Sequence, residues 1–256
     1  MTTWVLLRGL TREAGHWGDF AHRLAGRLDP KDKVVALDLP GNGTRNASNS
    51  PASVPAMAAA CRQDLADRGM QAPFAFVGMS LGGMVALHGA YAYADEVSGC
   101  VLINSSLRGH GAFWQRLRPL NYARLCRFLL PFLSPYEREH QVLLMTSADP
   151  QRHPEVARQW ETMATQRPVS RSNALRQLAA AARYAPPAGP PAVPLLLLAS
   201  AGDRLVSPQC SARLAAQWEV PLRMHPSAGH DLPLDDPEWV VQQIVGWRRP
   251  HAVPPG

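Results

Sequence analysis

Long apolar runs, cysteine and lysine are all scarce in this chain of 256 residues. No stretch of eighteen apolar residues occurs, so neither a membrane-spanning helix nor a membrane partner is expected. The first apolar run, Trp4–Leu7, is too short for a signal peptide. Cysteine and histidine form no metal-binding pattern, which predicts no metal and no other cofactor. The scattered cysteines are expected to be reduced thiols of a cytoplasmic protein, mostly in its core: Cys61, Cys100, Cys126 and Cys210.

Arginine carries nearly all of the positive charge, and the net charge of +6 is unevenly placed. Residues 108–185 hold twelve arginines and five acidic residues, a balance of +7, whereas the remainder of the chain balances at −1. One interpretation is that arginine simply coats exposed helices. The other is that an anionic substrate or an acidic acyl carrier docks on this segment. No nucleic-acid partner is predicted.

Apolar runs of strand length alternate with helical segments along most of the chain, and the composition is that of a globular protein. Because each run is apolar throughout, both faces of the sheet should be covered. The fold class is therefore predicted as α/β, with a mostly parallel sheet and helices on both faces. The expected strands are Trp4–Arg8, Val34–Leu37, Phe74–Val77, Gly99–Ile103, Leu195–Ala199 and Pro221–His225.

Residues 108–185 interrupt this rhythm, because they contain helical pieces and no strand-like run. A stiff proline-rich segment, Pro186–Pro194, follows them. We therefore expect residues 1–107 and 186–256 to form the core and residues 108–185 to form a helical cap over the carboxyl edge of the sheet. The expected cap helices are Phe113–Leu117, Tyr122–Leu130, Tyr136–Met145, Glu155–Gln166 and Ser172–Arg183.

A G-x-S-x-G motif, Gly78–Gly82, lies between a strand-type run and a helical run. In this setting the serine sits on a sharp turn that lifts its hydroxyl above the sheet edge. The flanking glycines are required because side chains there would collide. The turn also leaves the backbone N–H of Leu81 free at a helix N-terminus. The motif predicts Ser80 as a nucleophile.

A serine nucleophile needs a base, and the base needs an acid to orient it. His230 follows the last expected strand, and Asp203 follows the strand before it. Their order along the chain, serine, acid and histidine, is that of hydrolases built on this type of sheet. Other candidates for the acid are Asp231, Asp235 and Asp236, and Asp231 adjoins the base. Residues 104–106, after another strand, contain no carboxylate, which favours Asp203.

Four short matches make the chain resemble the α/β-hydrolase superfamily over nearly its whole length: Gly78–Gly83, Asp38–Gly43, Gly202-Asp203 and Gly229-His230. Within it, the chain is similar to the small-ester group that includes the pimeloyl-carrier methyl ester esterase and the menaquinone-pathway synthase MenH. The resemblance implies an oxyanion hole made by the N–H groups of Leu10 and Leu81.

One position departs from the family pattern, because Arg8-Gly9 stands where a His-Gly pair is usual. Backbone N–H groups do not depend on side-chain identity, so the oxyanion hole remains possible. Two roles are open for Arg8. It braces the loop, or it points a cation at the pocket. Asp38–Gly43 is interpreted as a structural turn, because it lacks the Gly-Lys-Ser/Thr ending of a phosphate loop.

The predicted function is hydrolysis of a small to medium acyl ester or thioester through a Ser-His-Asp triad and an acyl-enzyme. One alternative is lyase or synthase chemistry on an anionic small molecule with the same triad. Another is a binder of small molecules without catalytic activity. Candidate residues for an acyl pocket in the cap are Phe113, Trp114, Leu117, Leu129, Phe132 and Met145, although apolar residues of this kind more often belong to the core.

Overall fold

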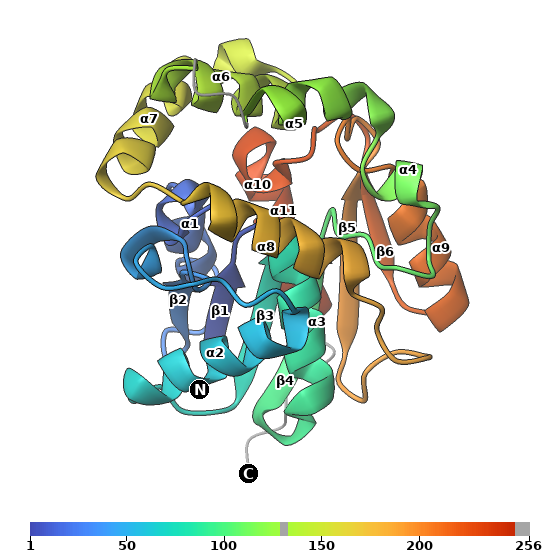
Figure 1. The fold of residues 1–256 in the computed structure, drawn as a ribbon. Helices are drawn as coiled ribbons and strands as arrows, with labels where there is room; N and C mark the ends of the chain where they lie inside the picture. Colours follow the sequence, from blue (N-terminus) through green and yellow to red (C-terminus); the bar gives the residue numbers. More distant parts are fainter. Residues whose placement is uncertain (129–132, 249–256) are drawn as a thin grey trace.

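The computed structural model describes residues 1–128 and 133–248 and contains a parallel sheet in the order β2-β1-β3-β4-β5-β6. All six expected strands are present in it, and the α/β fold class is confirmed (Figure 1). The strands are β1 (Thr3–Leu7), β2 (Lys33–Leu37), β3 (Phe74–Met79), β4 (Val97–Ile103), β5 (Leu195–Ser200) and β6 (Leu222–His225).

Successive side chains of each inner strand enter two different apolar clusters, one on each face of the sheet. In β1, Val5 and Leu7 join the first cluster, whereas Trp4 and Leu6 join the second. Side chains alternate between the two faces of a strand, so burial on both faces requires an uninterrupted apolar run. The inner strands are therefore recognisable in the sequence as uninterrupted apolar runs.

Two sets of helices cover the sheet (Figure 1). One face packs against α2 (Val54–Asp67), α3 (Leu81–Ala92) and α9 (Gln209–Trp218). The other packs against α1 (Phe20–Ala25) and α11 (Pro237–Arg248). The cysteines behave as core filler in three of four cases, since Cys126 alone is exposed. Burial raises the pKa of the Cys61 thiol to about 12, which keeps it protonated and unreactive.

The first helix is shorter than its apolar pattern predicts. The sequence indicates a helix over residues 17–28, but the chain forms a 3-10 turn at Ala14–Trp17 and then α1 from Phe20 to Ala25. Gly18 lies between them with φ of 52°. This conformation suits glycine and interrupts a right-handed helix.

Helices fill the chain between β4 and β5, as expected for residues 108–185. They are α4 (Phe113–Arg116), α5 (Tyr122–Phe128), α6 (Pro135–Thr146), α7 (Val156–Gln166) and α8 (Arg171–Arg183). In Figure 1, α5, α6 and α7 lie beyond the upper edge of the sheet, and α8 crosses in front of it. The remaining short helix, α10 (Leu232–Asp235), follows the loop that carries His230.

Candidate active site

Ser80 occupies the single residue between β3 and α3, with φ of 54° and ψ of −118°. This is a strained conformation for any residue other than glycine. A Cβ at Gly78 would lie 2.4 Å from the carbonyl oxygen of Gly82. A Cβ at Gly82 would lie 2.2 Å from the carbonyl oxygen of Leu7. The two glycines therefore make the turn possible in the way that the sequence predicts.

Neighbouring strands fix the backbone of this turn. The N–H of Ser80 donates to the carbonyl of Ile103 over 2.9 Å. The hydroxyl of Ser105 donates to the carbonyl of Ser80 over 3.0 Å. Gly83 leaves room for that hydroxyl, because a Cβ there would lie 2.0 Å from it. Such contacts hold the Ser80 backbone while leaving its side chain at the carboxyl edge of the sheet.

Asp203 and His230 meet in the structure, although 27 residues separate them in the sequence. The Nδ1 of His230 is 2.7 Å from Oδ2 of Asp203, and both side chains are almost fully buried. The other carboxylate oxygen accepts hydrogen bonds from the N–H groups of Leu205 and Val206, over 2.8 and 2.9 Å. Asp203 therefore accepts a hydrogen bond from a protonated Nδ1 of His230. In this tautomer Nε2 carries no proton and can accept one.

The other aspartates in this region are engaged elsewhere. Asp235 accepts hydrogen bonds from the hydroxyl of Ser147 and from the N–H groups of Ala148 and Gly229. Asp236 accepts from the N–H of Trp239. Asp231 forms an ion pair with Arg8, as described below. Only Asp203 among the four contacts the ring of His230 within the described residues.

Asn104 is a site residue that sequence reasoning missed. Its amide nitrogen donates to the carbonyls of His230 and Gly229, over 2.8 and 3.2 Å, and to the hydroxyl of Ser200. Its amide oxygen accepts from the N–H of Ser200. Asn104 thus ties the ends of β4 and β5 to the loop of the predicted base. Its φ is 46°, in the left-handed region that asparagine tolerates better than most residues. An asparagine directly after a strand is the signal by which the sequence could have indicated this turn.

The two predicted oxyanion donors belong to the two segments that border Ser80. Leu81 is the first residue of α3, where backbone N–H groups have no intrahelical acceptor. Leu10 follows Gly9, and a Cβ added to Gly9 would lie 3.7 Å from the Ser80 hydroxyl. Within residues 1–128 and 133–248, neither the Leu10 nor the Leu81 N–H donates a hydrogen bond. Both groups remain available to a ligand oxygen.

Arg8 does not point a free cation into the pocket. Its guanidinium donates to both carboxylate oxygens of Asp231, over 3.0 and 2.5 Å, and lies 5.0 Å from the ring centroid of Trp17. Both members of the pair are about 2% exposed. Of the two roles left open by the sequence, the brace is the one that these contacts support.

The same loop binds the cap through buried and partly buried polar contacts. Arg12 donates to Glu139 of α6 over 2.5 Å and lies over the ring of Trp160 of α7. Glu13 pairs with Arg167, just beyond α7. The N–H of Thr11 donates to the side chain of Gln177 of α8 over 2.8 Å. The cap is therefore attached directly to the segment that carries Leu10.

The proposed pocket residues of the cap occupy different environments. Phe113 and Trp114 are 70% and 54% exposed, and their rings meet edge to face. Leu117 is partly buried, and Met145 is buried. Leu129 and Phe132 lie outside the described residues. The structure thus brings Phe113 and Trp114 to the surface and places Met145 in the interior.

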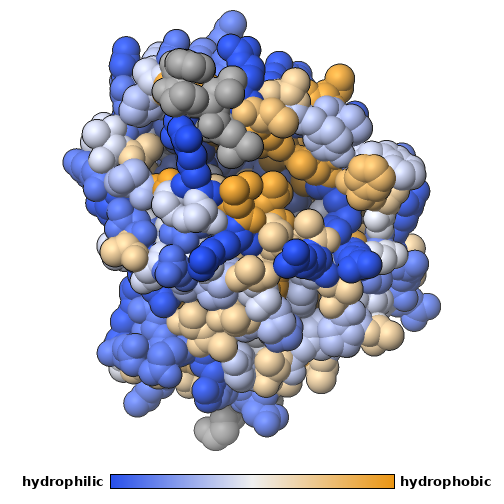
Figure 2. Space-filling view, in the orientation of Figure 1, coloured by the Kyte–Doolittle hydropathy of each residue, from blue (hydrophilic) through white to orange (hydrophobic). Residues whose placement is uncertain are grey.

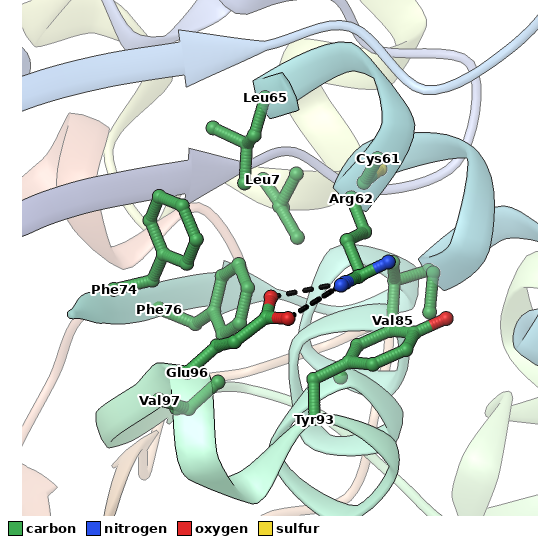
Figure 3. A pocket seen from close by; sticks show the side chains of 12 residues that line it. Leu7, Cys61, Arg62, Leu65, Phe74, Phe76, Val85, Tyr93, Glu96 and Val97 are labelled. Atoms are coloured by element: carbon green, nitrogen blue, oxygen red, sulfur yellow. Dashed lines mark hydrogen bonds and ion pairs between the residues drawn. The ribbon is translucent and has the colours of Figure 1, made fainter. Parts of the chain in front are cut away.

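A small pocket, lined in part by exposed side chains, lies away from this edge of the sheet (Figure 3). It is lined by Phe74 and Val97, which begin β3 and β4, and by the ion pair of Arg62 with Glu96. Its volume of about 10 Å³ is that of a single water molecule at most. It is a packing gap and not a substrate site. The described residues hold no cluster of metal-ligating side chains, and none of their helices is long and apolar enough to cross a membrane.

Comparisons with known proteins agree with this architecture. The family model described as "Alpha/beta hydrolase family" matches residues 4–243. A thermophilic esterase from Thermogutta terrifontis has a similar structure (TM-score 0.75, 21% identity), with 99% of this chain and 91% of that chain covered. A meta-cleavage product hydrolase from Pseudomonas fluorescens (TM-score 0.74, 18% identity) and an esterase from Rhodococcus (TM-score 0.73, 18% identity) each cover 96% of this chain and 90% of their own.

No curated protein sequence is a significant match. At these identities the solved structures establish the fold alone, whereas the family model spans nearly the whole chain. The enzyme status that the motifs predict is confirmed at the level of the family. The chain therefore belongs to the alpha/beta hydrolase family.

Proposed function

We propose that this enzyme is a serine hydrolase that cleaves a small to medium acyl ester or thioester. The observation that carries the proposal is the buried contact between His230 and Asp203 at 2.7 Å, on loops that follow β6 and β5. Ser80 follows β3 at the same carboxyl edge of the sheet, on a strained turn. A nucleophile, a base and an orienting acid on loops at one edge of a sheet are the parts that acyl transfer requires.

In the proposed reaction, the hydroxyl of Ser80 attacks the acyl carbon while Nε2 of His230 accepts its proton. Asp203 stabilises the imidazolium that forms. The oxygen of the tetrahedral intermediate accepts hydrogen bonds from the N–H groups of Leu10 and Leu81. Collapse expels the alcohol or thiol, which takes the proton from His230 and leaves an acyl group on Ser80. Water then attacks the acyl-enzyme by the reverse proton transfers and releases the acid.

The surface of the cap favours an apolar acyl group. Six of the eight exposed large apolar side chains in the described residues belong to the cap. Figure 2 shows apolar residues gathered around a hollow on the face that carries α8. A rim of this kind marks a binding groove more often than a plain monomer surface. The six residues are Phe113, Trp114, Leu120, Tyr122, Leu175 and Leu178.

Arginines of the cap suit an acidic acyl carrier as the bearer of the acyl group. Arg124, Arg171, Arg176 and Arg183 are exposed and form no ion pair within the described residues. Exposed charges steer association, and salt screens them. A carrier-linked ester should therefore lose kcat/KM as ionic strength rises, whereas the same acyl group on a neutral alcohol should not. Equal salt dependence of the two substrates would remove the carrier from the proposal.

The test of the hydrolase is turnover of p-nitrophenyl esters from acetate to decanoate, with wild type beside Ser80→Ala. We expect turnover that peaks at one chain length and a loss of roughly 10⁵–10⁶ in kcat in the variant. A much smaller loss in a folded Ser80→Ala would contradict the mechanism. An absence of turnover by folded wild type would favour lyase or synthase chemistry on an anionic substrate, for which the cap arginines are suited.

A further inference from the structure

We propose that Arg8 and Asp231 are positioning residues that fix the loop of Leu10 relative to the loop of His230. This inference rests on the proposed function, since it assigns the pair a role in the same acyl transfer. The two residues lie 223 positions apart in the sequence. Each is adjacent, or nearly so, to a group of the proposed reaction. Arg8 precedes Leu10 by two residues, and Asp231 follows His230 directly.

The pair has the geometry of a rigid link. Two parallel hydrogen bonds join the guanidinium to the carboxylate, over 3.0 and 2.5 Å. Bidentate pairing fixes both distance and orientation, which a single lysine contact cannot do. Trp17 covers one face of the guanidinium, and water is excluded because both side chains are about 2% exposed. A buried, doubly bonded pair holds one geometry much more firmly than a surface ion pair.

Each end of the link is anchored beside the predicted chemistry. On one side, the carbonyl oxygen of Arg8 lies 2.5 Å from where a Cβ of Gly82 would be, so its backbone packs directly on the turn of Ser80. On the other side, the N–H of Asp231 donates to Thr146 over 2.8 Å. The carbonyl of Asp231 accepts from the N–H of Leu234 in α10. Neither end can shift without disturbing its own loop.

No second polar contact in the described residues joins the two loops directly. Within residues 1–128 and 133–248, no other hydrogen bond or ion pair joins residues 8–12 to residues 229–231. Acyl transfer requires the base and an oxyanion donor to keep their relative positions. A displacement of about 1 Å can cost roughly 10²-fold in rate. The pair is thus the direct connection between these two loops.

A structural role and a positioning role make different predictions for the double variant Arg8→Met/Asp231→Leu. Removing one partner leaves a buried charge unpaired and destabilises the fold, so single variants are uninformative. Replacing both partners by apolar residues of similar volume is often neutral or stabilising. The double variant should therefore fold with a near-native melting temperature. If the two charges only neutralise each other, the double variant should also keep wild-type activity. If the pair positions the loops, the double variant should fold but lose activity.

The experiment measures kcat and KM on p-nitrophenyl esters together with amide hydrogen exchange of residues 9–12 and 228–231. We expect kcat to fall about 10²-fold, KM to change by less than about threefold, and exchange to accelerate in both loops. The affinity for an alkyl boronic acid, which forms a tetrahedral adduct on the serine, should weaken in proportion to kcat/KM. The matched control is Arg27→Met/Glu238→Leu, an exposed ion pair of 3.0 Å between the α1 region and α11. It should leave all four readouts unchanged.

Wild-type kcat and unchanged exchange in a folded double variant would overturn the proposal. A fall in kcat that is matched by the control variant would also overturn it. If wild type itself shows no turnover that depends on Ser80, the hydrolase proposal fails. The exchange comparison still decides whether the pair links the two loops, because it requires no substrate.

Discussion

The sheet and the cap are each stabilised by a different kind of contact. Inner strands such as β1 and β5 are apolar on both faces and enter two large clusters. Within the described residues, the separate apolar cluster of the cap has three buried members: Leu143, Ala157 and Trp160. The cap reaches the core both through Ala180 and Tyr184, which join the first of the sheet clusters, and through buried polar groups, such as Arg12 with Glu139 and Gln177 with Asn42.

This difference separates two tasks. Apolar burial is non-directional and gives the sheet its stability, so the loops at its edge can hold strained or charged groups. Polar contacts are directional and lose their value when one partner is missing. They place the cap in one orientation over the predicted site. The sheet thus carries the proposed chemistry, whereas the cap is suited to select what reaches it.

The largest effect is expected at the sheet edge, where the proposed triad lies. Asp203→Asn keeps the size of the side chain but removes the charge that orients Nδ1 of His230. We expect kcat to fall by roughly 10⁴, because the favoured imidazole tautomer changes, while KM and the melting temperature stay near native values. The matched control is Asp236→Asn, a partly exposed aspartate nearby. Retention of more than a tenth of wild-type activity by Asp203→Asn would contradict the assignment.

A smaller effect is expected from Asn104, which supports the base without touching its ring. Asn104→Ala removes the donors to the carbonyls of His230 and Gly229. We expect a loss of about 10²-fold in kcat, the size associated with a displacement near 1 Å. Hydrolysis kinetics beside thermal unfolding measure it. Should the melting temperature fall while kcat holds, Asn104 would be a structural residue only.

Substitutions in the two regions should separate stability from substrate selection. Leu197→Ala, in the sheet core, should cost about 2–5 kcal/mol of unfolding free energy without changing the preferred ester chain length. Gln177→Leu leaves the N–H of Thr11 and the amide oxygen of Asn42 without partners. It should cost about 1–3 kcal/mol and raise KM for the best substrate. Denaturant titration and ester profiles test both, and identical profiles would break the comparison.

The smallest effect is a pH dependence where the cap meets the sheet. Burial, followed by the charges of Arg12 and Arg8, lowers the pKa of His16 well below its ordinary value. The folded protein therefore holds His16 neutral, while the unfolded chain binds a proton below about pH 6.5. Stability contributed at higher pH is lost as the pH falls, by at most about 1.4 kcal/mol per pH unit. Unfolding of His16→Gln should be less sensitive to acid, and equal sensitivity would rule His16 out.

The sequence was informative where a function depends on local pattern. Strands buried on both faces need apolar runs, and the turn of Ser80 needs glycine at positions 78 and 82. The order of Ser80, Asp203 and His230 along the chain follows from the same topology. Helix boundaries depend less on local pattern. The apolar pattern runs on without a break through Gly18, whereas in the structure Gly18 separates a 3-10 turn from α1.

Contacts between distant residues were beyond that reasoning. Asn104 attracted attention only because it is not a carboxylate, yet its amide joins three segments through both of its polar atoms. Asp231 was weighed only as a possible acid, and its partner Arg8 lies 223 residues away. The chemistry of each side chain was visible in the sequence. Which residue it contacts depends on the order of the strands in the sheet.

The central claim is that Ser80 forms a covalent acyl intermediate. Intact-protein mass spectrometry during turnover of a slowly hydrolysed p-nitrophenyl ester, followed by peptide mapping, tests it most directly. The account predicts a mass increase of one acyl group on the peptide that contains Ser80 and no increase in Ser80→Ala. Steady turnover without an adduct, or an adduct at another residue, would contradict it.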